Sequence, residues 1–275
     1  MTRHLHDDLG HPVDLDGVAR VVSLVPSLTE AVAATAPGLL VGATDWCTHP
    51  ADLDVTRVRG TKNPRLATIR ALAPDLVIAN QEENRELDVR RLREAGVPVW
   101  VTRIETVPQA LTSMRRLLVD ALDCHLPDWL TEAERLYGGP PPEPTARVTI
   151  PIWRDPWMVV GRATFTGDLI RWFGWENAWA GHADRYPHVD LADLDRVSDA
   201  EDTDGTDLIL LPDEPYAFTA EDGPEAFTEV PTHLVSGRLL TWYGPSLIAA
   251  HAAFAPAGQW RPGAVAPRRS DGQAQ

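Results

Sequence analysis

Short apolar runs alternate with amphipathic stretches along the first part of the chain. The runs are RVVSLV (20–25), LLVGA (39–43), DLVIA (75–79) and VPVWV (97–101), each as long as a strand, with helical patterns between them. Such alternation is typical of βα units around a mostly parallel sheet. The pattern therefore predicts an N-terminal α/β lobe over residues 1–105.

A longer helical pattern follows, from about Val107 to Tyr137, with an interruption at Pro127 and an end at the stretch GGPPP (138–142). Beyond this break the alternation returns. Strands are predicted at RVTIPIW (147–153), DLILL (207–211) and LLTWY (239–243), and helices at 164–173 and 245–254. Residues 106–146 are thus predicted to be a connecting helix and Pro-rich linker, and residues 147–255 a C-terminal α/β lobe.

The total length fits this division, because 275 residues are enough for two domains of ordinary size. Residues 256–275 are rich in Pro, Gly and Ala without periodicity, which predicts a loose tail. The expected fold class is α/β, with two Rossmann-like lobes of mostly parallel sheets joined by a connecting helix. A ligand cleft is expected between the lobes.

Two helix starts are expected at the ends of strands. The segment PSLTE (26–30) contains a capping box formed by Ser27 and Glu30, and Asn84 is expected to cap a helix that runs to Glu94. Free backbone N–H groups at such starts suit a carboxylate, an amide or a phosphate on a ligand.

Charge excludes several classes of partner. Forty acidic and 25 basic residues leave a formal charge of −15, which repels nucleic acid and anionic lipid surfaces. No stretch approaches the length of a membrane span. The expected partner is a small-molecule ligand.

The cysteines and the N-terminus bear on the compartment. Cys47 and Cys124 are the only cysteines and are predicted to be free thiols in a reducing compartment. The stretch MTRHLHDDLG contains neither the apolar run of a signal peptide nor a lipid-acceptor cysteine. These features predict a cytoplasmic location, with a periplasmic or cell-surface location as the alternative if a leader has been removed.

Catalytic and metal-binding patterns are weak. The G-x-G-x-x-G, P-loop, G-x-S-x-G and H-E-x-x-H motifs are absent, so no catalytic residue is assigned and an enzyme is not expected. Two sets of donors are candidate metal ligands: Asp45, Cys47 and His49, which stand at every second position, and a second cluster of His182, Asp184 and His188. Solvated loops are the favoured interpretation of both sets, and no metal site is assigned.

Aromatic residues gather where predicted strands end, and ligands bind beyond the carboxyl ends of strands in open α/β sheets. Ten tryptophans are present, and aromatic walls with a few polar groups suit a large, flat, partly polar ligand. For Trp153, Trp157 and Trp242 a place in the pocket and a place in the core both stay open. The predicted ligand-binding residues are Pro26, Ser27, Trp46, Lys62, Asn63, Asn80, Glu82, Glu83, Trp153, Trp157, Arg162, Tyr216, Trp242 and Tyr243.

Several segments together carry a family likeness: DDLGHPVDL, RVVSLVPSLTE, VGATDWCTHP, RALAPDLVIANQEEN and REAGVPVWVT. The chain resembles the class III substrate-binding proteins of ABC importers, the helical-backbone metal receptors, and within them the cobalamin-binding branch. The likeness is strong over residues 7–125 and looser over 147–255. It implies a ligand held between two lobes, little hinge motion and no catalysis. It places Trp46 at an aromatic position that faces the corrin, and Trp242 on another stretch near the cleft.

Other positions depart from that branch. Asn80 stands where the branch has a tryptophan, and another cleft tryptophan maps near Thr61 or Lys62. Ala67 and Ala192 occupy the places of the two glutamates that dock on permease arginines, with Asp193 the nearest acid, which makes docking doubtful. The connecting helix from Asp128 to Tyr137 is about half the ~20 residues expected of one that spans two lobes.

Three functional hypotheses follow. The leading one is a cytoplasmic binding protein for a corrinoid or related metal chelate, held in an aromatic cleft without covalent attachment and without catalysis. The alternative is an exported ABC-importer binding protein for cobalamin, iron-siderophore or haem. A lesser alternative is an enzyme that has recruited the cleft, with Glu82, Glu83, Asp45 or His49 as acid–base groups.

Overall fold

A computed structural model describes residues 2–198 and 205–255, which divide into two compact units. Unit 1 comprises residues up to Pro140 together with Trp242–Ala249, and unit 2 comprises the described residues of Pro141–Thr241 and those from Ala250 onward. The two-lobe α/β prediction with mostly parallel sheets is confirmed. The predicted boundary range, 106–146, contains the division after Pro140.

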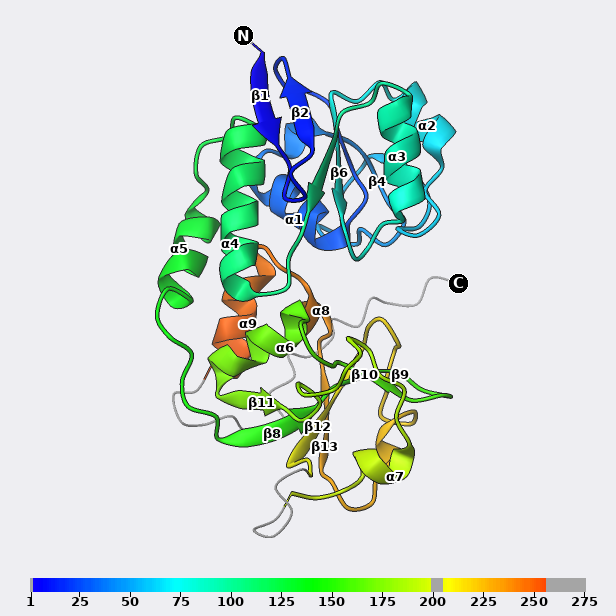
Figure 1. Ribbon diagram of the computed structural model, residues 1–275, viewed down its shortest axis with the longest axis vertical. Helices are drawn as coiled ribbons and strands as arrows, with labels where there is room; N and C mark the ends of the chain where they lie inside the picture. Colours follow the sequence, from blue (N-terminus) through cyan, green and yellow to red (C-terminus); the bar gives the residue numbers. More distant parts are fainter. Residues whose placement is uncertain (1, 199–204, 256–275) are drawn as a thin grey trace. The chain divides into compact units, whose positions relative to one another are not determined.

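Unit 1 is built on a five-stranded parallel sheet in the order β5-β4-β3-β6-β7 (Figure 1). The strands are β3 (Val21–Ser23), β4 (Leu40–Ala43), β5 (Thr56–Arg57), β6 (Leu76–Asn80) and β7 (Val99–Thr102). Strands β3, β6 and β7 are buried along their whole length. This burial on both faces explains why continuous apolar runs predicted them.

Helices cover both faces of this sheet. They are α1 (Pro26–Thr35), the short 3₁₀ helix η1 (Pro37–Leu39), α2 (Leu66–Ala71), α3 (Glu86–Glu94), α4 (Val107–Arg115), the π-helical turn η2 (Arg116–Ala121) and α5 (Asp128–Leu136). Ile69 of α2 and Val89 and Leu92 of α3 pack in one core with Val22 and Val77 of the sheet. Figure 1 shows α4 on the opposite face. The predicted helix interruption at Pro127 is confirmed, because α5 begins directly after it.

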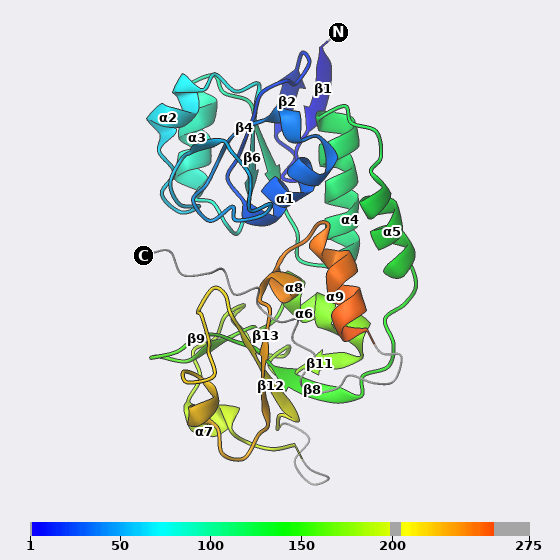
Figure 2. The ribbon, with the colours of Figure 1, turned by 180° about the vertical axis from the view of Figure 1, so that it is seen from behind.

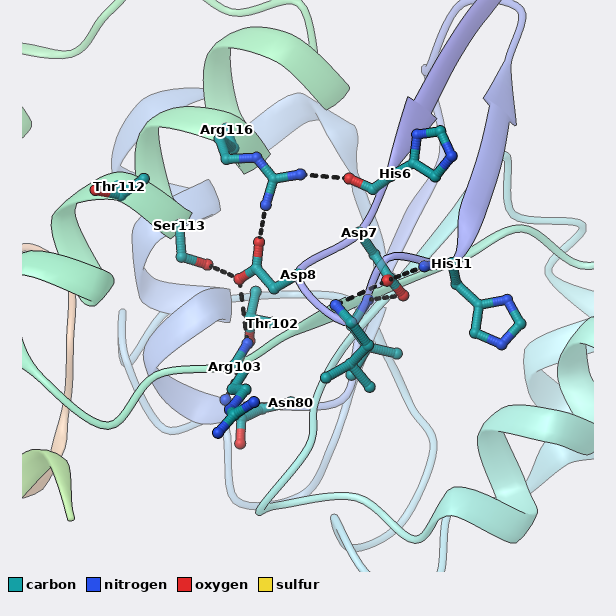
Figure 3. A network of polar contacts seen from close by, with 12 residues as sticks. His6, Asp7, Asp8, His11, Asn80, Thr102, Arg103, Thr112, Ser113 and Arg116 are labelled. Atoms are coloured by element: carbon teal, nitrogen blue, oxygen red, sulfur yellow. Dashed lines mark hydrogen bonds and ion pairs between the residues drawn. The ribbon is translucent and has the colours of Figure 1, made fainter. Parts of the chain in front are cut away.

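An antiparallel hairpin, β1 (Arg3–His6) and β2 (Pro12–Leu15), precedes the sheet and was not predicted. Its turn is fixed by two carboxylates (Figure 3). Asp7 is 2% exposed and accepts from the backbone N–H groups of Leu9, His11 and Val101, and from Arg93 at 2.6 Å. Asp8 accepts from Ser113 and Arg116 of the α4–η2 segment and from the N–H of Arg103. Charge-assisted bonds therefore tie the hairpin to β7 and to the α4–η2 segment.

Unit 2 contains a four-stranded parallel sheet in the order β11-β8-β12-β13 (Figures 1 and 2). Its strands are β8 (Ala146–Thr149), β11 (Trp175–Asn177), β12 (Leu208–Pro212) and β13 (Thr232–Val235). A separate antiparallel hairpin is formed by β9 (Pro151–Trp153) and β10 (Met158–Val159). The single strand predicted over 147–153 is thus two strands, which belong to different sheets.

The helices of unit 2 are short. They are α6 (Phe165–Leu169), the 3₁₀ helices η3 (Ile170–Phe173) and η4 (Pro224–Ala226), α7 (Leu191–Leu194) and α8 (Arg238–Thr241). The last helix, α9 (Ser246–Phe254), confirms the helix predicted from residue 245. Trp157, Ile209, Leu211 and Phe218 are central members of the core of this unit.

The strand predicted at LLTWY (239–243) is wrong. Residues 238–241 form α8, and the edge strand of the sheet is β13, THLV, a few residues earlier. The periodicity of a short apolar run does not distinguish a buried strand from a buried helix. In this segment the helix is supported by the Thr241 hydroxyl, which donates to the Gly237 carbonyl one turn earlier at 2.9 Å.

Two other predictions concern the connection and the end of the chain. Helix α5 has 9 residues, as the short pattern after Pro127 predicted. The predicted loose tail, 256–275, lies outside the described residues. Within residues 2–198 and 205–255, no helix combines the length and the apolar character needed to cross a membrane.

Candidate functional site

Most of the predicted ligand-binding residues of unit 1 follow the carboxyl ends of its parallel strands. Ser27 follows β3, Trp46 follows β4, the segment 80–84 lies at the end of β6, and Thr102 ends β7. Parallel strands end at the same edge of a sheet, so these loops meet there. We call this surface the unit 1 edge.

Two buried asparagines build the unit 1 edge. Asn80 is 3% exposed; its side-chain oxygen accepts from the N–H groups of Glu82 and Glu83, and its amide donates to Thr102 Oγ1 at 3.1 Å. The Asn84 amide donates to the carbonyls of Leu24 and Thr61, and its oxygen accepts from the Asn80 N–H. Both side chains therefore hold loops together, and their polar atoms are occupied.

The predicted helix caps are wrong. Helix α3 begins at Glu86 after Arg85, so Asn84 does not cap it, and the Asn84 N–H donates to the Asn80 carbonyl. Helix α1 begins at Pro26 after Val25, with no side-chain cap. Proline is favoured at the first helical position, so the helix starts at Pro26 and the capping position is Val25, two residues before Ser27. Ser27 therefore lies in the first turn, where it is 4% exposed.

Trp46 is the most exposed aromatic side chain of the unit 1 edge, with 65% of its surface in contact with solvent. The loop that carries Lys62 and Asn63 lies beside it. A methyl group built on Gly60 would lie 3.1 Å from Trp46 Nε1 and 2.7 Å from Asn63 Oδ1. The glycine thus permits the close approach of this loop to the indole.

The segment Trp242-Tyr243-Gly244 returns to unit 1 from the C-terminal part of the chain and packs under its edge. Trp242 is 6% exposed, and its ring meets His49 edge-on at 5.3 Å between centroids. Tyr243 lies against Ser27 and Thr102; burial, with a smaller contribution from the charges of Glu83 and Glu82, raises the pKa of its phenol. The segment therefore contacts the loops that follow β3, β4, β6 and β7.

Some of the charged and thiol side chains at the unit 1 edge form hydrogen bonds within the protein. Lys62 is exposed, and its ammonium donates to the Glu82 carbonyl. Glu82 and Glu83 are half-buried. Cys47 is buried, with its sulfur accepting from the Thr29 hydroxyl at 3.0 Å, and burial raises the pKa of the Cys47 thiol. A protonated, enclosed thiol is a poor metal ligand.

Unit 2 presents a second exposed tryptophan at the end of the hairpin strand β9. Trp153 ends β9, which follows β8 directly, and is 47% exposed. Tyr216, in the loop after β12, meets it edge-on at 5.5 Å. The Tyr216 hydroxyl donates to Asp222 at 2.6 Å, and this hydrogen bond raises the pKa of Tyr216.

Arg154 holds the loop next to Trp153. It pairs with Asp222 and with Glu225, the latter at 2.6 Å, and its guanidinium lies 5.2 Å over the Trp157 ring. Trp157 itself is 8% exposed and stacks on Phe218 in the core of unit 2, a position that favours packing. Arg162 is exposed on the loop before α6.

The remaining candidates are scattered. In the described residues, no group of three or more His, Cys, Asp or Glu side chains is arranged to hold a metal ion. His182 Nδ1 lies 4.0 Å from Asp184, and His188 is exposed. Ala67 on α2 and Ala192 on α7 are both exposed.

Sequence reasoning missed several neighbours of the predicted residues. His49 was weighed as a metal ligand or an acid–base group, whereas the structure places it against Trp242. Arg154, Asp222 and Glu225 were not singled out, although Arg154 lies between two predicted aromatic residues. No sequence signal joins Arg154 to acids some 70 positions later, because only the tertiary fold brings them together.

Comparisons with known proteins agree with these observations. No family model matches the chain. A vitamin B12-binding protein of Vibrio parahaemolyticus is 25% identical over 181 residues, which cover 63% of this chain and 66% of that protein. One of Salmonella typhimurium is 27% identical over 186 residues, covering 65% and 69%. The chain thus spans about two thirds of the length of these relatives.

Solved structures share the fold. The periplasmic vitamin B12-binding protein of Vibrio cholerae superimposes with a TM-score of 0.63 at 16% identity, covering 85% of this chain and 93% of that one. The periplasmic heme-binding protein of Roseiflexus sp. RS-1 gives 0.66 at 20% identity, covering 86% and 98%. These proteins are named for binding, which agrees with the prediction of a binding protein rather than an enzyme.

The prediction of a cytoplasmic location is contradicted, because similar solved structures are named as periplasmic proteins. It rested on the composition of the first residues, and a cleavable leader is no part of a mature fold. The sequence matches and the shared two-lobe α/β fold confirm the resemblance to the class III substrate-binding proteins of ABC importers, nearest the vitamin B12-binding branch.

Proposed function

We propose that this protein is an exported substrate-binding protein of an ABC importer, that it binds a large, flat metal chelate, and that a corrinoid is the first candidate. Binding involves no covalent attachment and no chemistry. The relatives named for vitamin B12 support the corrinoid, and the solved structures named for heme make haem the comparison ligand.

One observation carries the proposal. Trp46 and Trp153 are the two tryptophans among the exposed large hydrophobic side chains of the described residues. Trp46 follows β4 of the parallel sheet of unit 1, and Trp153 ends β9, the hairpin strand that follows β8 of the parallel sheet of unit 2. Leaving an indole in water forgoes the free energy of burying it, about 2–3 kcal/mol for a large apolar side chain. Exposed aromatic surface at a sheet edge is therefore suited to a ligand that covers it.

The buried residues beneath support these surfaces. Asn80, Asn84 and Tyr243 fix the loops of the unit 1 edge, and Arg154 with Asp222 fixes the loop beside Trp153. A rigid site loses little conformational entropy when its ligand binds.

Docking on a permease would need groups other than the two expected glutamates. Ala67 and Ala192 carry no charge, and Asp193, exposed on α7, is the acid next to Ala192. We propose Asp193 as a docking residue; loss of co-purification with the permease on Asp193→Asn is the expected result.

Titration of the purified full chain tests the binding role. Cyanocobalamin, dicyanocobinamide and haemin are added in separate experiments, followed by absorbance and by calorimetry. Binding of a corrinoid in the micromolar range or tighter is expected, with a loss of about tenfold or more in Trp46→Ala, in keeping with one large aromatic contact. Leu126→Ala, which removes another exposed apolar side chain, is the matched control. Absence of binding to all three ligands at 50-fold the protein concentration would refute the proposal.

A further inference from the structure

The segment from β5 through α2 differs in charge from the rest of the chain. Between Val55 and Pro74 there are five basic residues and no acidic one, in a protein whose formal charge is −15. The basic residues are Arg57, Arg59, Lys62, Arg65 and Arg70. Such a local excess of one sign creates a positive potential that the remainder of the protein opposes.

Two of these cations have structural partners. The Arg57 guanidinium donates to the carbonyls of Thr44, Cys47 and Leu53, and so holds the loop that carries Trp46. The Lys62 ammonium donates to the Glu82 carbonyl. In the described part of the chain, Arg59 and Arg65 are exposed and pair with no acidic side chain.

Arg59 and Arg65 are attached to a tightly bonded part of the unit 1 edge. The Arg59 carbonyl accepts from the Asp45 N–H at 2.9 Å, and the Arg65 N–H donates to the Val58 carbonyl at 2.7 Å. Between them, Gly60 lies against the Trp46 indole. The backbone that carries the two arginines is therefore anchored beside Trp46, the most exposed aromatic residue of unit 1.

The backbone of Arg59 adds an independent observation. Its φ is +72°, a region in which glycine is favoured and a branched or long side chain costs free energy. Within the described residues, the side chain forms no hydrogen bond or ion pair that would offset this cost. Strained positions of this kind gather at ligand sites, where the side chain serves binding.

We infer that Arg59 and Arg65 form a binding site for an anionic group on the periphery of the flat ligand, a carboxylate or a phosphodiester, while the ligand plane covers Trp46. Arginine suits both anions, because its planar fork binds two oxygens at once. The anion site rests on the proposed function, since the anion belongs to the chelate that is proposed to bind there.

Two porphyrins of matched size and opposite charge test the site: tetrakis(4-carboxyphenyl)porphyrin and tetrakis(N-methyl-4-pyridyl)porphyrin. Non-specific attraction to a protein of charge −15 favours the cationic one. Wild-type protein is expected to bind the carboxylated porphyrin at least about tenfold more tightly at 150 mM salt, where the long-range attraction of the net charge for the cationic porphyrin is largely screened. Tighter binding of the cationic porphyrin, or no measurable binding of either, would overturn the inference.

Two double variants with equal loss of charge locate the effect. Arg59→Asn with Arg65→Gln is expected to abolish the preference, and asparagine tolerates the positive φ. Arg70→Gln with Arg90→Gln removes two exposed arginines of α2 and α3 and is expected to retain it. Equal losses in both would show a general field effect and refute the site.

The natural candidate ligands then separate the two sources of the anion. Cyanocobalamin carries a phosphodiester that dicyanocobinamide lacks, and haemin carries two carboxylates that its dimethyl ester lacks. A preference confined to one of these pairs identifies the source. Corrinoid binding without any preference for anions refutes the anion site and leaves the proposed function standing. A preference for the anionic porphyrin without any binding of corrinoid or haemin supports the anion site and refutes the proposed function.

Discussion

The ring of His49 meets the ring of Trp242 edge-on, with centroids 5.3 Å apart and planes at 85°. The two residues come from opposite ends of the chain, yet both belong to unit 1. Their contact fixes the C-terminal segment Trp242-Tyr243-Gly244 beneath the loop that carries Trp46.

Removing this contact should destabilise unit 1. Trp242 is 6% exposed, so Trp242→Ala leaves a large cavity and is expected to lower the free energy of unfolding by about 3–5 kcal/mol. Trp46→Ala, at an exposed position, is expected to change it by less than ~1 kcal/mol. Denaturant titrations of both variants measure the difference; equal effects would show that the segment does not support the fold.

Tyr243 predicts a dependence of stability on alkaline pH. Burial raises the pKa of this phenol in the folded state, so the folded protein keeps a proton that the unfolded chain releases near pH ~10. The stabilising contribution is complete below that pH and is lost as the pH rises above it. The free energy of unfolding of the wild type should therefore fall more steeply between pH 9 and 11 than that of Tyr243→Phe.

Tyr137 provides the comparison for this experiment. Its hydroxyl donates to the Leu247 carbonyl at 2.8 Å, and burial raises its pKa as well. Tyr137→Phe should reduce the alkaline slope in the same direction, and the double variant should reduce it further. Identical slopes in the wild type and the double variant would contradict the assignment of the slope to these two phenols.

Asn84 is expected to control the shape of the unit 1 edge. Its amide joins Leu24 and Thr61, and its oxygen accepts from the Asn80 N–H. Asn84→Ala leaves these buried groups without partners and should cost about 1–3 kcal/mol of stability and weaken ligand binding. Asn63→Ala, at an exposed position of the same edge, should cost less than ~0.5 kcal/mol of stability.

Thermal unfolding together with ligand titration checks both asparagine variants. Asn84→Asp keeps the acceptor but sets a buried carboxylate against the Leu24 and Thr61 carbonyls, so a loss of stability at least as large as that of Asn84→Ala is expected. A stability of Asn84→Ala equal to that of the wild type would contradict the role of this side chain in joining the loops.

Asp7 and Arg93 predict a strong coupling. The carboxylate is 2% exposed and lies 2.6 Å from the guanidinium. Replacing one partner leaves a buried charge, so Asp7→Asn should cost about 3–5 kcal/mol. A double-mutant cycle with Arg93→Met should give a coupling energy of ~1–3 kcal/mol. Asp14→Asn, in the exposed pair with His4, is the control, and a similar cost there would contradict the expectation.

The sequence by itself determined the layers of the fold. The runs that became β3, β4, β6, β7 and β12 are continuous and apolar because those strands are buried on both faces, and a local pattern reports such burial directly. Pro127 also predicted the interruption of the helix, since proline lacks the N–H that a helix interior needs. Family segments in the first half added the expectation of a corrinoid-like ligand.

Tertiary structure decided which of the candidate residues face solvent. Trp46 and Trp157 both follow strands, yet one is 65% exposed and the other lies in a core, because Phe218 and Phe227 from a distant loop cover the second ring. Asn80 and Asn84 are polar residues at a strand end that turned inward to satisfy buried backbone groups. The segment LLTWY became a helix and a turn because its aromatic residues pack on unit 1 rather than in the sheet of unit 2. Exposure and partnership depend on residues far apart in the chain, so only the folded chain determines them.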